Sequence, residues 1–336
     1  MKGNGWRKTL QTRKKRLVVT RFLVIFVAFL LVMSGTVEAR VKRRCQKACT
    51  MTAIAAFKAC HNEARNDYWI ARGNCYNLSD QKACKECLKE AKEAFKEAKE
   101  MCKEQFEARL EICDELGEAP YDPEIDPANF VDPSEIGKTV NPNPYFPLIK
   151  GNRWEYYCES SGETIIDEVT EKTKEIMGVT CVIVHDLVTI DGEVVEDTED
   201  WYAQDIYGNV WYFGEIAKEF EDGELVSIEG SWKAGEDDAK AGIIMLASPE
   251  IEDIYRQEFS LGNAEDMAKI LSIGEESVTV PYGSFNTDVL KTMDFTPLEP
   301  DVLEYKYYAP GIGVVLEKNP DTGERVELMK FEPGSP

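Results

Sequence analysis

Side chains that could perform nucleophilic or acid/base catalysis are scarce in this 336-residue sequence. It has two histidines, His61 and His185, and no Gly-x-Ser-x-Gly motif that would present a nucleophilic serine. A hydrolytic triad would have to use His185, yet the sequence suggests no nucleophile near it. We therefore predict that His185 is an ordinary strand residue and that the protein is not an enzyme.

Carboxylates are so abundant that no single pair of them is informative. Two clusters could hold Ca²⁺ through oxygen ligands, but neither follows the Asp-x-Asp-x-Asp-Gly order of a calcium loop. They are Glu196, Asp197, Glu199 and Asp200, and Glu236, Asp237 and Asp238. We expect solvated acidic loops there, with no metal and no cofactor. A hydrolase using two carboxyl groups is kept as an alternative, which requires a facing pair roughly 5 to 9 Å apart in an open cleft.

Aromatic residues on predicted strands point more clearly to a function. Between Asp200 and Glu215, two aromatic runs flank a turn at Gly208-Asn209, which predicts a β-hairpin with large side chains on both faces. Strand alternation sends some of them inward, where they either fill the core or line a cavity for an apolar ligand. For the second case we predict ligand contacts from Trp201, Tyr202, Trp211, Phe213, Trp232 and Tyr255.

Six cysteines are spaced as mirror images along the chain. Cys49, Cys60 and Cys75 are 11 and 15 residues apart, and Cys87, Cys102 and Cys113 are 15 and 11 residues apart. Steps of this size are close to whole helical turns, so each helix of an antiparallel hairpin would keep its three cysteines on one face. The spacing predicts three disulfides that staple the hairpin: Cys49 with Cys113, Cys60 with Cys102, and Cys75 with Cys87.

The remaining cysteines leave alternatives open. Cys45 and Cys84 lie at opposite ends of the predicted hairpin, so either one of them links to a second chain in a disulfide-bonded dimer, or Cys84 replaces Cys87 in its disulfide. The Cys84-x-x-Cys87 spacing lacks the histidine that haem attachment needs. Cys158 and Cys181 are predicted to form a fourth disulfide or to stay as two buried thiols.

The elements that position these residues divide the chain into four parts. A leader, 1–39, precedes a cysteine-rich helical hairpin, 40–117, whose two helices meet at Asn77-Leu78-Ser79-Asp80. Seven prolines in the segment 118–147 rule out regular helix or central strand, so it is an extended linker or a packed surface strap. A β-domain, 148–336, follows.

The β-domain reads as a succession of strands separated by turn dipeptides such as Ser161-Gly162, Asp191-Gly192 and Asp222-Gly223. Short connections predict sequential antiparallel neighbours that close into a barrel or half-barrel. The segment 230–242 is predicted to be a mobile loop at its mouth. The predicted fold class is therefore α+β: an N-terminal disulfide-stapled helical hairpin followed by an antiparallel meander β-barrel or half-barrel.

Several motifs resemble a widespread family of uncharacterised secreted bacterial β-domains. They include Asn143-Pro144-Tyr145-Phe146-Pro147-Leu148, Trp201-Tyr202-Ala203-Gln204-Asp205, Gly208-Asn209-Val210-Trp211-Tyr212-Phe213-Gly214-Glu215 and Tyr307-Tyr308-Ala309-Pro310-Gly311. The resemblance covers 142–317 and implies export and a β fold, but it assigns no activity and no catalytic residue. Members often carry an acidic residue where this chain has Tyr207, which argues against a metal loop there.

The leader and the charge distribution predict where the protein acts. Basic residues, twelve apolar residues from Phe22 to Met33, and a small-residue site at Val37 and Ala39 are typical of a signal peptide cleaved after Ala39. A retained anchor would need a longer apolar run. Residues 119–336 carry fifteen basic and forty-seven acidic side chains, a net charge of −32, which repels nucleic acid and anionic lipid. We expect a secreted or periplasmic protein without nucleic acid or membrane partners after cleavage.

These observations favour an exported, non-catalytic binding protein whose β-domain holds a small apolar ligand or a component of the cell envelope. The hairpin would act as a spacer or dimerisation arm. The alternatives are a structural surface protein without a ligand and the carboxylate-based hydrolase.

Overall fold

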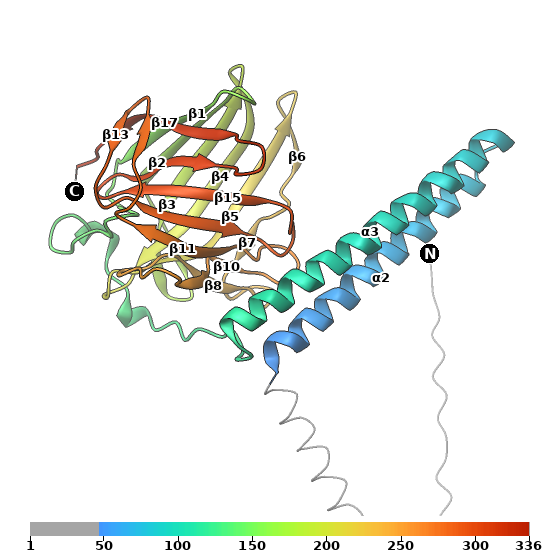
Figure 1. Ribbon diagram of the computed structural model, residues 1–336, viewed down its shortest axis with the longest axis horizontal. Coiled ribbons are helices and arrows are strands. Elements are labelled where there is room, and N and C mark those ends of the chain that lie inside the picture. The colour runs from blue at the N-terminus through green and yellow to red at the C-terminus, as the bar shows by residue number, and fades with distance from the viewer. Residues whose placement is uncertain (1–46, 336) are drawn as a thin grey trace, which may run out of the picture. The chain divides into compact units, whose positions relative to one another are not determined.

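The computed structural model describes residues 47–335, which belong to one compact unit (Figure 1). The predicted signal peptide and Cys45 lie outside these residues. Within them, two helices are followed by a nearly closed antiparallel β-barrel, so the predicted fold class is confirmed. No helix in this part of the chain has the length and apolar character needed to cross a bilayer.

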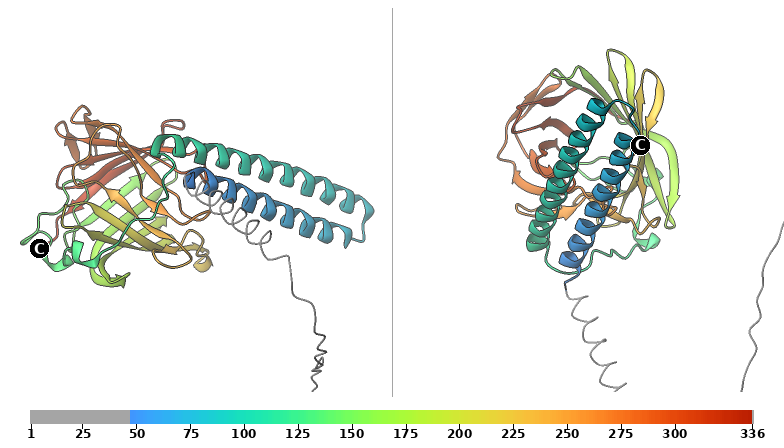
Figure 2. Two further views of the ribbon diagram at one scale, coloured as in Figure 1. Left: turned by 90° about the horizontal axis from the view of Figure 1, so that it is seen from below. Right: turned by 90° about the vertical axis from the view of Figure 1, so that its right-hand side faces the viewer.

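The hairpin consists of α2 (Ala48–Tyr76) and α3 (Gln81–Leu116), which lie side by side (Figure 2). Asp80 begins α3 because its carboxylate accepts a hydrogen bond of 2.7 Å from the Ala83 amide. Glu118, just beyond α3, accepts a 3.0 Å hydrogen bond from the amide of Thr50 in the first turn of α2. The open end of the hairpin is therefore tied together by its own polar contacts.

All three predicted disulfides of the hairpin are present. Cys49–Cys113, Cys60–Cys102 and Cys75–Cys87 join α2 to α3 with Cα–Cα distances of 5.6, 5.7 and 5.5 Å. Small buried residues between them, such as Ala53 and Ala91, let the helices approach closely enough for these bridges. Cys84 carries a free thiol near the turn.

The barrel is one antiparallel sheet built from two meanders. The first contains β1 (Arg153–Cys158), β2 (Glu163–Ile176), β3 (Val179–Ile190), β4 (Glu193–Gln204) and β5 (Val210–Glu221), with β6 (Glu224–Ser227), β7 (Trp232–Lys233) and β8 (Lys240–Met245) beside β5. The second contains β11 (Met267–Ile273), β14 (Leu290–Phe295), β15 (Leu303–Ala309), β16 (Gly313–Lys318) and β17 (Arg325–Glu332). Pairing of β1 with β17 joins the two meanders.

The sheet almost closes on itself at two short consecutive strands. β9 (Ile254–Arg256) pairs with β11 and β10 (Glu258–Phe259) pairs with β8, so a single residue, Gln257, connects the two ends of the sheet. A Cβ atom at Gly242 would lie 2.1 Å from the Gln257 carbonyl oxygen, so only glycine fits at this seam. A separate hairpin of β12 (Val278–Val280) and β13 (Gly283–Phe285) lies apart from the barrel sheet.

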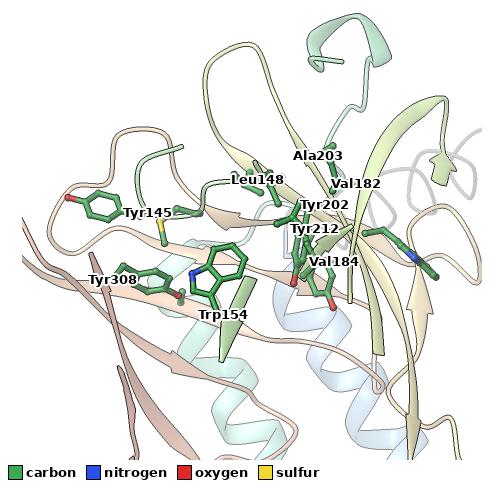
Figure 3. Close-up of a cluster of buried hydrophobic side chains, with 14 of the residues drawn as sticks. Tyr145, Leu148, Trp154, Val182, Val184, Tyr202, Ala203, Tyr212 and Tyr308 are labelled. Atoms are coloured by element: carbon green, nitrogen blue, oxygen red, sulfur yellow. The ribbon is translucent and has the colours of Figure 1, made fainter. Parts of the chain in front are cut away.

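The proline-rich segment 118–147 is a packed strap rather than a free linker. It contains the 3₁₀ turns η1 (Pro127–Asn129) and η2 (Pro133–Glu135). The side-chain amide of the buried Asn143 donates hydrogen bonds to the carbonyls of Gly208 and Leu246, and the backbone amide of Asn143 donates one to Gln204 Oε1. The strap thereby fixes the turn of the β4–β5 hairpin. Beside the strap lies a hydrophobic core rich in aromatic rings, which includes Tyr145, Leu148, Trp154, Tyr202, Tyr212 and Tyr308 (Figure 3).

The predicted fourth disulfide is absent. Cys158 and Cys181 are both buried free thiols, which is the second of the two alternatives predicted for them. The reason is the strand order: Cys158 lies on β1 and Cys181 on β3, and β2 lies between them. Strands separated by a third strand are about 9 to 10 Å apart, which exceeds the reach of a disulfide.

Candidate functional site

The six aromatic residues predicted to bind a ligand lie in separate surroundings. Tyr202 stacks on Tyr212 with ring centroids 4.6 Å apart, and Trp232 packs edge-on against Tyr212 at 5.3 Å. Tyr212 lies on β5, and on the opposite face of β5 the rings of Phe213 and Trp211 pack against Phe130 of the strap. These five rings are occupied by one another and by the strap.

The other two predicted residues are also buried. Trp201 alternates with Tyr202 along β4, and its ring is covered by the Lys174 ammonium, 3.2 Å from the ring centroid. Tyr255 on β9 is 8% exposed, and its hydroxyl has no hydrogen-bond partner in the described residues. The structure therefore brings together Tyr202 and Trp232, and it also brings together Trp211 and Phe213, without placing all six around one cavity.

The barrel interior contains a row of carboxyl groups on neighbouring strands. Asp167 on β2 lies opposite Asp186 on β3. Asp200 on β4 lies opposite Val184, which is two residues before Asp186 on β3. Burial, followed by the charge of Asp186, raises the pKa of Asp167 well above its usual range. Burial, followed by the charge of Asp200, raises the pKa of Asp186 to about 8. Burial therefore favours the protonated form of both carboxyl groups.

Asp167 Oδ1 and Asp186 Oδ1 are both buried and have no hydrogen-bond partner within residues 47–335. Asp200 accepts a hydrogen bond from the Tyr212 hydroxyl, and burial raises its pKa as well. Lys306 supplies an inward positive charge, 3.4 Å from Glu317.

His185 lies elsewhere, and the prediction of a solvated acidic loop is wrong for the first acidic cluster. Its members Glu196, Asp197, Glu199 and Asp200 all lie on β4, and Asp200 is buried in the interior row. The second cluster, Glu236, Asp237 and Asp238, is an exposed turn as predicted. His185 Nε2 is 3.2 Å from Asp197 Oδ1 on the half-exposed outer face of the barrel. Asp197 also lies 3.6 Å from the ammonium of Lys218. Within residues 47–335, no group of three or more His, Cys, Asp or Glu side chains is arranged to hold a metal ion.

A hollow with a mostly apolar lining lies where the open end of the hairpin meets the barrel. We call it the junction crevice, and its volume is about 620 Å³. Its walls come from α2, α3, the first residues of the strap, and the segment around β8–β10. The lining residues are Ala48, Cys49, Thr52, Ala53, Arg109, Ile112, Cys113, Leu116, Gly117, Ala119, Pro120, Tyr121, Asp237, Asp238, Lys240, Ile243, Ile254, Tyr255, Arg256, Phe259, Ser260, Leu261 and Glu265.

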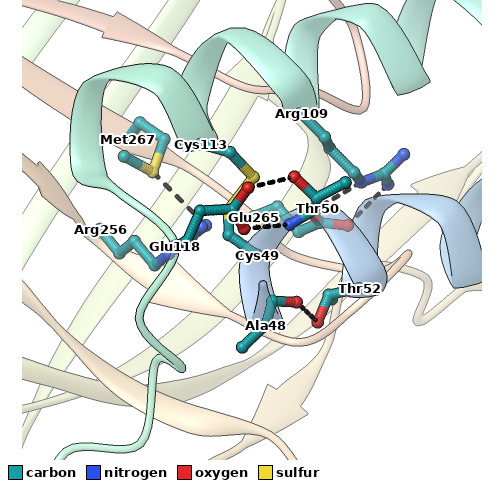
Figure 4. Close-up of a disulfide and its surroundings, with 10 residues drawn as sticks. All are labelled: Ala48, Cys49, Thr50, Thr52, Arg109, Cys113, Glu118, Arg256, Glu265 and Met267. Carbon is teal, nitrogen blue, oxygen red and sulfur yellow. Dashed lines mark hydrogen bonds and ion pairs between the residues drawn. A yellow bond between two sulfur atoms is a disulfide. The ribbon is translucent and has the colours of Figure 1, made fainter. Parts of the chain in front are cut away.

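A buried ion pair fixes the hairpin to the barrel at the crevice (Figure 4). Arg109 of α3 donates to both oxygens of Glu265, at 3.0 Å from Nε and 2.7 Å from Nη2. The Gly262 amide donates to Glu265 as well, at 2.7 Å. Arg109 is 6% exposed and Glu265 1% exposed, so the pair is shielded from water and fully hydrogen-bonded.

A second arginine in the crevice has no such partner. The Arg256 guanidinium lies 5.5 Å from the centroid of the Tyr121 ring and 5.0 Å from that of Phe259. Its Nη1 is 3.7 Å from the Met267 sulfur, and its buried Nε has no hydrogen-bond partner in the described residues. Burial lowers the pKa of Arg256. The crevice thus combines apolar walls with one uncompensated cation.

Sequence reasoning did not find this site, because its residues are far apart in the chain. Arg109 and Glu265 are separated by 156 positions. One signal was present: Arg109 is the single arginine of α3, whose other basic residues are lysines. Arginine is preferred to lysine where a planar, bidentate contact to a carboxylate must be buried.

Comparisons with protein-family models, with curated proteins and with solved structures found no match to this chain. The resemblance to secreted bacterial β-domains therefore stays a prediction.

Proposed function

We propose that this is an exported, non-catalytic binding protein that holds a small apolar ligand in the junction crevice. The observation that carries this proposal is the crevice itself: about 620 Å³, lined largely by aliphatic and aromatic side chains. Ligand sites for small molecules are concave, mostly apolar and about 300 to 1,000 Å³ in volume. The β-domain would supply eleven of the 23 lining residues, and the hairpin and the strap would supply the other twelve. Tyr255 is the one predicted ligand residue among them.

Export is part of the same proposal. Three disulfides within the hairpin suit an oxidising compartment outside the cytoplasm. The hairpin would have two uses: one wall of the ligand site at its open end, and a spacer or dimerisation arm toward Cys84 near its turn.

Native mass spectrometry of the protein from its own secretion route tests the proposal. We expect extra mass on the monomer that disappears on denaturation. Ala48 lines the crevice, so Ala48→Phe should fill part of it and reduce the bound fraction. Ala55→Phe, on an exposed position of the same helix, is the matched control and should leave the bound mass unchanged. Ligand-free protein in every preparation would instead favour the structural surface protein.

Carboxylate-based hydrolysis is the second candidate, and one observation favours it. Asp167 and Asp186 lie opposite each other on neighbouring strands, burial raises the pKa of both, and a carboxyl group with a raised pKa can act as a general acid. Glycoside hydrolysis needs two carboxyl groups roughly 5 to 9 Å apart in an open cleft, whereas the Oδ1 atoms of this pair are buried in the barrel interior. Hydrolysis of a substrate panel that is lost in Asp167→Asn and retained in Ala48→Phe would establish it over the binding proposal.

A further inference from the structure

We propose that Arg256 binds the carboxylate of a single-chain amphiphile whose apolar chain occupies the junction crevice. This inference rests on the proposed function and deepens it, because it names the chemical class of the ligand and the residue that recognises it.

The balance of buried charge supports an anionic group. Both oxygens of Glu265 already accept hydrogen bonds from Arg109, and Oε1 accepts another from the Gly262 amide. The negative charge of Glu265 is therefore neutralised by Arg109. Arg256 is half-buried and its Nε has no hydrogen-bond partner in the described residues, while the acidic lining residues Asp237 and Asp238 are exposed. A partly desolvated cation without a hydrogen-bonded carboxylate is costly. A ligand with a single negative charge would balance it.

The position of the guanidinium supports the same conclusion. Tyr121 and Phe259 pack edge-on against each other with ring centroids 5.5 Å apart, and both rings contact the guanidinium. The Tyr121 hydroxyl donates a 2.8 Å hydrogen bond to the Ala241 carbonyl. Arg256 Nε lies in this framework without a partner. Because this guanidinium is already held in place, it would lose little conformational entropy when a ligand binds, and its planar shape suits a carboxylate.

The surroundings select a monovalent head group on an apolar chain. Phosphate monoesters carry about −1.5 to −2 charges at neutral pH, which exceeds the single charge of Arg256. Asp237 and Asp238 are exposed lining residues of the crevice and would repel the surplus. A carboxylate without a chain would leave the apolar walls uncovered and gain little from burial. A single-chain carboxylate satisfies both the cation and the walls.

Isothermal titration of the delipidated, oxidised protein with three probes tests this inference. Dodecanoate has the chain and the carboxylate, dodecanol has the chain alone, and acetate has the carboxylate alone. We expect dodecanoate to bind on the order of 10- to 100-fold more tightly than dodecanol, the range for a hydrogen bond to a charged group, and acetate not to bind measurably.

Variants of Arg256 separate recognition of the carboxylate from loss of the pocket. Arg256→Met keeps the apolar stem and should weaken dodecanoate to the level of dodecanol while leaving dodecanol unchanged. Arg256→Lys should restore part of the preference. Lys269→Met removes a nearby cation paired with Glu252, 2.9 Å away, and should leave all three probes unaffected.

The outcomes distinguish the two proposals. Equal binding of dodecanoate and dodecanol, unchanged in Arg256→Met, would overturn the role of Arg256 and leave the apolar ligand site standing. Absence of binding by both chain-bearing probes in the wild type would overturn both proposals. Loss of dodecanol binding in Arg256→Met would show that Arg256 shapes the crevice rather than recognises a head group, and would also overturn the inference.

Discussion

Asp186 should make the folded protein lose stability as the pH rises, the reverse of the behaviour of a salt-bridged carboxylate. Its pKa is raised from 3.8 to about 8 in the folded chain by burial and by the charge of Asp200. In the unfolded chain its pKa is ordinary, so at intermediate pH the folded state holds a proton that the unfolded state has released. This stabilisation is complete below about pH 4 and is lost as the pH rises through about 8.

The expected effect is large enough to measure. One pKa unit corresponds to about 1.4 kcal/mol, and Asp186 is half-buried rather than fully enclosed. The full shift would lower the free energy of unfolding by about 3.6 kcal/mol between about pH 5 and pH 8, and we expect about half of that free energy, about 2 kcal/mol, because water screens the exposed part of the side chain. Burial also raises the pKa of Glu215, to about 7, and this adds a loss of the same sign.

Asp186→Asn isolates the contribution of Asp186. The substituted amide has nearly the same shape as the protonated carboxyl group but never ionises. We expect the variant to gain about 2 kcal/mol over wild type at about pH 8 and little at about pH 5. Urea unfolding with the disulfides intact measures both values. Glu199→Gln, on the outer face opposite His185, is the control and should keep the wild-type slope.

Two results would refute this reasoning. The first is a wild-type protein that is equally or more stable at the higher pH. The second is an Asp186→Asn variant with the same loss of stability between the two pH values as wild type. In either case the carboxyl row would be ionised and solvated, and the barrel interior would be open to water.

Two further predictions concern the hairpin. Arg109→Met should remove the ion-pair partner of the buried Glu265 and destabilise the docking of the hairpin on the barrel by about 3 to 5 kcal/mol. Hydrogen exchange measured by mass spectrometry should then show faster amide exchange in α3 near Arg109, and unchanged exchange would contradict this prediction. Cys84→Ser should abolish any dimer that reductant dissociates, as judged by non-reducing electrophoresis, and a dimer that persists in the variant would assign the link to another cysteine.

The parts of the fold that could be predicted are those in which the spacing or type of neighbouring residues determines the backbone geometry. Three mirror-related cysteine spacings fix a hairpin because the helical repeat is constant, and all three disulfides followed. Asp191-Gly192 and Asp222-Gly223 marked turns because their backbone φ values are positive, which glycine and aspartate tolerate. β8 was missed because Gly242, which permits close approach to Gln257, resembles part of a loop.

The candidate site depended on contacts that no local pattern encodes. Alternation along β5 indicates that Tyr212 and Phe213 point to opposite faces, but it does not reveal that Phe130 of the strap covers Phe213. In the same way, nothing near Arg109 in the sequence indicates Glu265. The crevice forms between three segments, and its shape follows from how they dock.

The Cys49–Cys113 bridge at the open end of the hairpin belongs to the crevice wall. Its reduction would loosen that wall, while the two bridges nearer the turn would hold the remaining length of the helices together. For the proposed ligand, occupancy of the crevice and the oxidation of this one bridge would then be thermodynamically linked: a molecule that binds the oxidised form more tightly would make the bridge harder to reduce, and reduction would promote its release. A thiol reductant in the surroundings would act as an unloading signal, and the empty protein would be the form most open to it.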